Sequence, residues 1–139
     1  VNRQPGSGTR LAFDQMIKDA GIDPQTIQGF ETEEFTHLAV AAMVAGEAAD
    51  IALGIHAAGA RFGLRFKPAF SERYMLAVRR EALNMPGIAA VIKLLTSHEF
   101  QQRSAAMVGY NCADAGTVSK VETFFAGVGG MVEKRMVKH

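Results

Sequence analysis

The stretch that decides the fold is "VNRQPGSGTRLAFDQMI", residues 1–17 of this 139-residue chain. Its first residues, "VNR", are typical of an extended strand, and "PGSG" at residues 5–8 is typical of a tight turn. A helix is predicted to begin near Thr9, because apolar residues then recur along one helical face. A strand, a glycine-rich turn and a helix in this order indicate the first unit of an α/β fold.

The glycine-rich turn also gathers groups that bind anions. Ser7 and Thr9 supply hydroxyls, and Gly8 lets a ligand approach the backbone closely. Arg3 and Arg10 add guanidinium groups suited to a tetrahedral oxyanion. Because the first N–H groups of a helix lack intrahelical partners and the helix dipole is positive at that end, these residue types predict an anion site. A helix that is merely capped by Ser7 or Thr9 fits the same residues, and both interpretations stay open.

Composition narrows the class of protein. The chain is 48% hydrophobic and 21% charged with a net charge of +1, so nucleic acid and anionic membrane are not expected partners. The single Cys112 excludes an internal disulfide, and no His or Cys lies at ligand spacing, so we expect no metal and no cofactor. No apolar run reaches transmembrane length, and no signal peptide is expected. No lysine follows Gly8 as a P-loop requires, and no nucleophile and base stand together, so no catalytic residue is predicted.

Helices and strands alternate along the rest of the chain. Further helices are predicted after Thr36, over residues 56–63, from Pro86, and after a Thr96–Glu99 capping box, with a helical turn at Asp23-Pro24. Further strands are predicted at residues 29–31, 50–55, 64–70 and 73–79. Because residues 50–55, "DIALGI", are apolar on both faces, we expect a largely parallel sheet covered on both sides. Residues 121–139 fit an amphipathic tail helix that glycines interrupt.

Three blocks of sequence resemble a known family. "NRQPGSGTR" at residues 2–10, "THLAVAAMVAGEAADIALGI" at residues 36–55 and "ERY" at residues 72–74 occur in the order and spacing of the periplasmic-binding-protein-like domain of molybdenum-related cytoplasmic proteins. In that family the domain is often fused to molybdenum-cofactor biosynthesis proteins or to winged-helix regulators. The resemblance covers roughly residues 1–116. It implies a type II solute-binding fold, in which two α/β lobes enclose a ligand cleft, and a cytoplasmic location.

The resemblance also implies roles for parts of this chain. Residues 1–68 would form one nearly complete ligand-binding lobe, residues 69–116 part of the other lobe, and residues 117–139 a tail of uncertain structure. The ligand-binding residues predicted on this basis are Arg3, Ser7, Gly8, Thr9, Arg10, Thr36, His37 and Tyr74. Met75 departs from the acidic residue that the family usually carries after the tyrosine. Since half of the cleft wall is absent, a second copy in a homodimer, or a fused domain, is expected to cover it.

These observations together predict a non-catalytic binding domain for a small oxyanion. Molybdate and tungstate are favoured over phosphate and sulfate, because the turn offers hydrogen-bond donors and no acceptor for a phosphate proton. Glu33 or Glu34 reaching into the site would reverse that preference. The predicted role is a sensor or delivery module in molybdenum metabolism. An oligomerisation module with a vestigial anion site, and a site for a larger phosphate-bearing ligand such as a pterin, remain alternatives. His56, at the end of residues 50–55, is a second candidate site residue.

Overall fold

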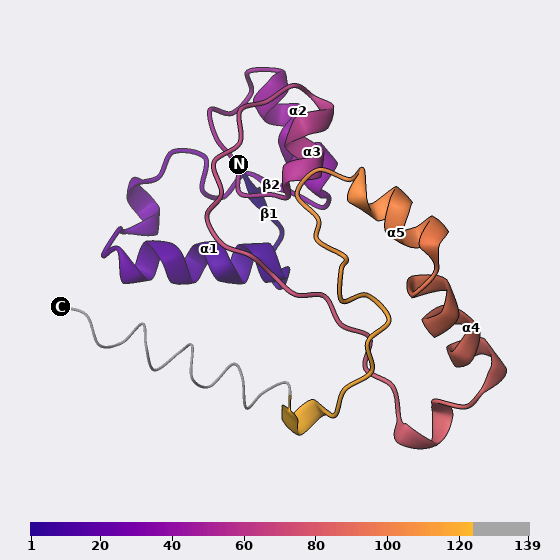
Figure 1. The fold of residues 1–139 in the computed structure, drawn as a ribbon. Helices are drawn as coiled ribbons and strands as arrows, with labels where there is room; N and C mark the ends of the chain where they lie inside the picture. The colour runs from indigo at the N-terminus through magenta and orange to yellow at the C-terminus, as the bar shows by residue number, and fades with distance from the viewer. Residues whose placement is uncertain (124–139) are drawn as a thin grey trace. The chain divides into compact units, whose positions relative to one another are not determined.

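The computed structural model describes residues 1–123, and it divides the chain into two compact units (Figure 1). The first unit comprises residues 1–75 and 107–110. The second comprises residues 76–106 and continues from residue 111. The predicted tail helix falls almost entirely on residues 124–139, outside the described residues. Among the helices of the described part of the chain, none is both long enough and apolar enough to cross a membrane.

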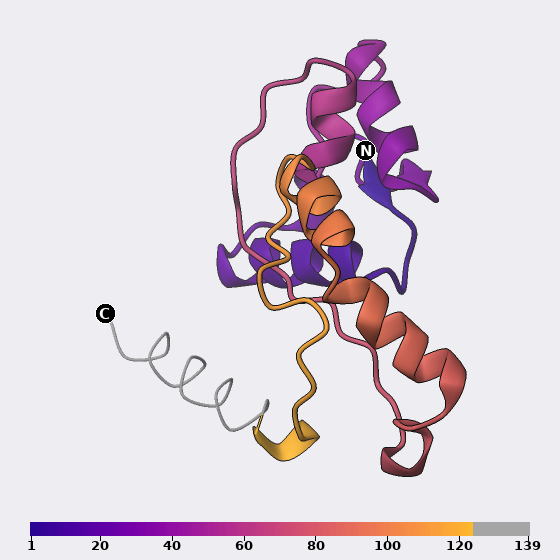
Figure 2. The same cartoon turned by 45° about the vertical axis from the view of Figure 1, so that its right-hand side comes forward.

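A short parallel strand pair organises the first unit. β1 (Asn2–Arg3) pairs with β2 (Glu33–Glu34), with Asn2 opposite Glu33 and Arg3 opposite Glu34. Backbone hydrogen bonds extend the pair at both ends, from Asn2 N to Thr32 O at 2.8 Å and from Gln4 N to Glu34 O at 3.1 Å. Both views show the pair between α1 on one side and α2 with α3 on the other (Figures 1 and 2). Helices around parallel strands agree with the α/β class.

Helix α1 (Gly8–Asp19) follows β1 as the sequence predicts, one residue earlier than expected. Gly21 lies just beyond the C-cap Ala20 with a φ of 66°, a left-handed conformation that glycine adopts without a steric cost. The amide of Ile22 closes this end by donating to Ile17 O at 2.9 Å. The predicted termination by Gly21 is therefore confirmed.

Two further helical elements of the first unit begin at their predicted caps. The 3₁₀ turn η1 (Pro24–Thr26) is capped by Asp23, and α2 (His37–Ala45) is capped by Thr36. α3 (His56–Arg61) has no side-chain cap. Val40 and Ala41 of α2 and Ala58 of α3 are buried, so a small core lies where these helices pack together.

Four of the predicted strands are wrong. Residues 29–31 form a turn, and the strand lies at Glu33–Glu34 instead. Residues 50–55, 64–70 and 73–79 contain no strand. A strand exists only when a neighbouring strand accepts its hydrogen bonds, and within residues 1–123 the structure holds one strand pair. Apolar side chains of these segments are exposed instead of covered by a sheet, since Ile51 is 79% exposed and Leu76 is 72% exposed.

The second unit is helical in its regular parts. It contains η2 (Arg80–Ala82), α4 (Pro86–Leu95) and α5 (His98–Ala105). Pro86 begins α4 as predicted, but the predicted Thr96–Glu99 capping box is wrong. Ser97 caps α5 by accepting from Phe100 N at 3.2 Å, whereas Thr96 ends α4 and donates to Ile92 O at 3.1 Å. Two neighbouring residues carry hydroxyls here. Ser97 provides the cap, because the Thr96 hydroxyl points back to the carbonyls of Ile92 and Lys93 in α4. Helix α5 also ends at Ala105, earlier than the predicted end near Gly109.

Candidate functional site

Two helix N-termini follow the two strands of the sheet. β1 leads into α1 through residues 4–7, and β2 leads into α2 through residues 35–36. Because the strands are parallel, both connections leave the same edge of the sheet, where α/β proteins bind ligands. Each N-terminus carries a hydroxyl cap, Ser7 on α1 and Thr36 on α2. The predicted site residues of the first two sequence blocks, residues 2–10 and 36–55, therefore lie at or follow one edge of the sheet.

Ser7 is the N-cap of α1. Its hydroxyl accepts from Arg10 N at 3.2 Å and donates to Gln4 O at 3.0 Å. The capping interpretation is therefore correct for Ser7, whose one hydroxyl proton is donated to Gln4 O. An anion contact by Ser7 stays a prediction. Gly8 and Thr9 are the first two residues of the helix, and their amides donate no hydrogen bond to any described residue. A Cβ added at Gly8 would meet no atom within 4 Å, so the backbone here is open.

Arg3 links the two connections. Its Nη2 donates to the backbone oxygen of Phe35 at 2.9 Å, and its Nε donates to Gln4 Oε1 at 3.1 Å. One guanidinium thus touches residues that precede each helix. Its remaining N–H groups supply positive charge at the edge where both helices begin.

Arg10 lies in a different environment from Arg3. Its guanidinium is buried, donates to Asp14 at 2.8 Å and to Glu33 at 2.9 Å, and lies 4.3 Å from the centre of the Phe30 ring. Burial by itself lowers the pKa of the Arg10 guanidinium, but the hydrogen bonds and charges of Asp14 and Glu33 raise it by more. The net pKa lies above its ordinary value, so Arg10 stays protonated. This geometry favours a structural role, and an anion contact by Arg10 stays a prediction.

Thr36 and His37 stand at the start of α2. The Thr36 hydroxyl accepts from Ala39 N at 3.0 Å, which is a standard N-cap contact. The Nδ1 atom of His37 is buried and has no hydrogen-bond partner. Burial and the positive charge of Arg3 lower the pKa of His37, and the carboxylate of Glu72 raises it by less, so the imidazole is neutral near pH 7.

Tyr74 is an exposed residue of the first unit. Its side chain is free of the core, with 77% of the residue exposed, and its hydroxyl contacts Glu72 Oε2 at 3.5 Å. Glu72 in turn acts electrostatically on His37. The ligand-binding role of Tyr74 stays a prediction.

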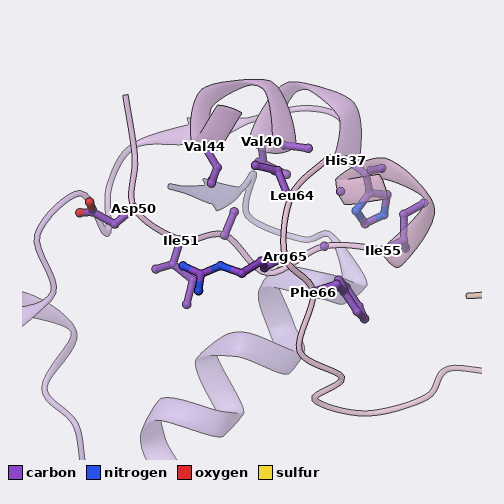
Figure 3. Close-up of a pocket in the computed structure, with 14 residues that line it drawn as sticks. His37, Val40, Val44, Asp50, Ile51, Ile55, Leu64, Arg65 and Phe66 are labelled. Carbon is purple, nitrogen blue, oxygen red and sulfur yellow. The ribbon is translucent and has the colours of Figure 1, made fainter. Parts of the chain in front are cut away.

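A pocket of about 340 Å³ lies beside α2 and α3 (Figure 3). His37, Val40 and Val44 come from α2, and Ile55, Leu64 and Phe66 lie nearby. No sequence pattern predicted this pocket, because its lining comes from residues spread between positions 37 and 66 of the chain. The candidate His56 lies next to it, stacked on the Phe66 ring at 4.3 Å. Within residues 1–123 no group of His, Cys, Asp or Glu side chains is arranged to hold a metal ion.

Comparison with known proteins identifies the family. The PBP superfamily domain model, which describes periplasmic-binding-protein-like domains, matches residues 1–96. An "uncharacterized protein in ferredoxin 2Fe-2S gene 5′region" of Clostridium pasteurianum is 33% identical over 109 residues, which cover 78% of this chain and 96% of that protein. The protein YvgK of Bacillus subtilis (strain 168) is 27% identical over 118 residues, and the match spans 38% of its length. No solved structure matches the chain significantly. The sheet, its two capped helices and the match over residues 1–96 agree, and the chain belongs to the PBP superfamily of ligand-binding domains.

Proposed function

We propose that the chain binds a small oxyanion at the edge where α1 and α2 begin, in a domain built on the type II solute-binding plan. The observation that carries the proposal is the pairing of β1 with β2, which brings the N-termini of α1 and α2 to one sheet edge. The amides of Gly8 and Thr9, the Thr9 hydroxyl and Arg3 would donate to the anion. Two helix dipoles and one guanidinium favour a dianion there.

Molybdate and tungstate are the favoured ligands within this proposal. Both are fully deprotonated near neutral pH and need only donors, whereas hydrogen phosphate also needs an acceptor for its proton. Of Glu33 and Glu34, the two carboxylates that could reverse this preference, Glu33 is bound by Arg10 at 2.9 Å. An acceptor engaged in this way is poorly placed to receive a phosphate proton. The domain would act as a sensor or delivery module in molybdenum metabolism. Binding of the anion would shift the domain toward one of its conformations.

A second candidate function is an assembly module, and the exposed apolar segment at residues 74–78 favours it. Met75 is 56% exposed and Leu76 is 72% exposed, although their pattern is typical of a strand. A second copy of the chain, or a fused domain, would cover such side chains. On this reading the anion site is vestigial.

Thermal unfolding with molybdate, tungstate, sulfate and phosphate at matched ionic strength tests the proposal. An anion present at about a hundred times its Kd stabilises the fold by roughly 2.7 kcal/mol, which raises Tm by several degrees. We expect this response to molybdate and tungstate. The same shift with all four anions would refute selectivity, and no shift with any would refute the oxyanion site.

Variants at Thr9 and Ser7 test the anion site differently, because Ser7 also caps α1. Thr9→Val removes a hydroxyl that makes no side-chain hydrogen bond within residues 1–123, so it should weaken the anion response with little loss of stability. Ser7→Ala also removes a cap, which costs about 1 kcal/mol. Ser97→Ala is the matched control, since Ser97 caps α5 with the same 3.2 Å contact to an amide three residues on. Sedimentation of the Thr9→Val variant then tests the assembly function, which predicts an unchanged oligomer.

A further inference from the structure

The pocket beside α2 contains an unsatisfied polar atom. His37 Nδ1 is buried there without a hydrogen-bond partner. Buried polar side-chain atoms in folded proteins nearly always have a partner. The backbone at Gly54 leaves room next to this atom, because a Cβ added there would stand 3.7 Å from Nδ1. A ligand group with a hydroxyl or N–H would supply the missing partner.

A cation stands on the other side of the same pocket. Figure 3 shows the Arg65 side chain extending toward Ile51, away from His37, with Asp50 beyond it. Arg65 makes no ion pair and no side-chain hydrogen bond with any residue between 1 and 123. Asp50 lines the same side and is not ion-paired with Arg65. A single ligand carboxylate can therefore pair with Arg65. A second negative group on the ligand would be repelled by Asp50, which lines the same side of the pocket.

Between these two ends the wall is apolar. Val40, Val44, Ile55, Leu64 and Phe66 are among the side chains that line it. The volume of about 340 Å³ lies at the lower end of the range for small-molecule sites, which are mostly apolar with a few polar groups that fix orientation. An apolar body with one polar group at each end matches this distribution.

We propose that this pocket binds a small amphipathic monocarboxylic acid: its flat apolar body lies against α2 and Leu64, its carboxylate meets Arg65, and a hydroxyl or N–H at its other end bonds to His37 Nδ1. The site is separate from the oxyanion site at the start of α1. The proposed oxyanion donors Gly8, Thr9 and Arg3 do not line this pocket, so either site can fail without the other.

6-Hydroxy-2-naphthoate is a suitable probe, with a hydroxyl and a carboxylate at opposite ends of a flat apolar body. The chain has no tryptophan, so naphthoate fluorescence can be followed without interference from indole. We expect saturable binding with one site per chain. We also expect 2-naphthoate, which lacks the hydroxyl, to bind about tenfold more weakly, because one hydrogen bond contributes on that scale.

Variants assign the binding to His37. His37→Phe should weaken 6-hydroxy-2-naphthoate about tenfold and leave 2-naphthoate nearly unchanged. His98→Phe is the matched control, since His98 also begins a helix behind a hydroxyl cap but is exposed and lies in the second unit. Gly54→Ala places a methyl group against Nδ1 at ordinary contact distance and should weaken the probe even if His37→Phe does not fold.

Three outcomes would overturn the inference. They are no saturable binding of the probe at millimolar concentration, equal affinity for both naphthoates, and equal loss in His37→Phe and His98→Phe. Thr9→Val should leave probe binding intact, so a failed oxyanion site and a failed pocket give different patterns.

Discussion

The Arg10 ion-pair cluster offers a sharp test of how the first unit is held together. Arg10 of α1 reaches Glu33 of β2 at 2.9 Å, so it joins a helix to the strand that brings in the second half of the sheet. Its side chain is 8% exposed, whereas those of Asp14 and Glu33 are 45% and 28% exposed. Replacing Arg10 by methionine keeps most of the apolar stem and removes the charge.

The size of the effect follows from this partial burial. Removing one partner of a fully buried ion pair costs about 3–5 kcal/mol. Because both carboxylates retain contact with water, we expect the Arg10→Met variant to lose less, about 2–3 kcal/mol in the free energy of unfolding. A double-mutant cycle with Glu33→Gln should give a coupling of about 1–2 kcal/mol, the scale of a partly buried charged hydrogen bond.

The second unit supplies a matched control. Arg103 and Glu99 form an ion pair at 2.8 Å, but their side chains are 79% and 69% exposed. Their cycle, Arg103→Met with Glu99→Gln, should give only about 0.3–0.5 kcal/mol. Urea unfolding followed by circular dichroism measures both cycles. Equal coupling energies in the two pairs would refute the argument that burial makes the Arg10 pair important.

The same variant also tests the role of Arg10 in ligand binding. If Arg10 is structural, the Arg10→Met protein should keep its molybdate response, provided that the measurement is made well below its lowered Tm. Loss of that response with the fold intact would instead place Arg10 among the anion donors.

Three further predictions concern single positions. Gly109→Ala should destabilise the fold by more than Gly63→Ala in urea unfolding: both glycines have positive φ, but a Cβ at Gly109 would stand 2.6 Å from His56 Cβ, while Gly63 faces open space. A difference below about 0.5 kcal/mol would contradict the close approach at Gly109. Ser97→Ala should cost about 1 kcal/mol and Thr96→Val much less, because Ser97 caps α5; the reverse order in thermal unfolding would restore the Thr96 capping box. Burial and Arg3 hold the pKa of His37 below its ordinary 6.5, so the unfolded chain binds the proton more readily than the folded chain as pH falls through 6.5. The free energy of unfolding should therefore drop in that range. His37→Phe should flatten this pH dependence, and His98→Phe should leave it unchanged.

Caps and turns were predictable from sequence because they depend on contacts only a few residues apart. Ser7, Asp23 and Thr36 each bind an amide two or three residues on, and the residue types that do so are few. Gly21 likewise ends α1 through its own backbone conformation. The capping box failed at Thr96 for a local reason as well, since the neighbouring Ser97 satisfies the same geometry.

The positions of the two helix N-termini that flank the candidate site were also evident in the sequence. The "PGSGT" turn and Thr36 were both assigned to helix N-termini, and the structure has α1 and α2 beginning there. The engagement of Arg10 with Glu33 was not evident, because 23 residues separate the two side chains. Spacing alone cannot distinguish an arginine that faces a ligand from one that binds a carboxylate.

The sequence by itself determined where α1, η1 and α2 begin, where α1 ends, and that the chain carries a glycine-rich turn after a short strand, since these features rest on local hydrogen bonds and backbone preferences. Only the tertiary structure decided which apolar segments become strands, that Arg10 is bound by two carboxylates, and that His37 Nδ1 faces a pocket without a partner. The physical reason is that a strand, an ion pair between elements and a pocket each need a second segment, whose position no local pattern specifies.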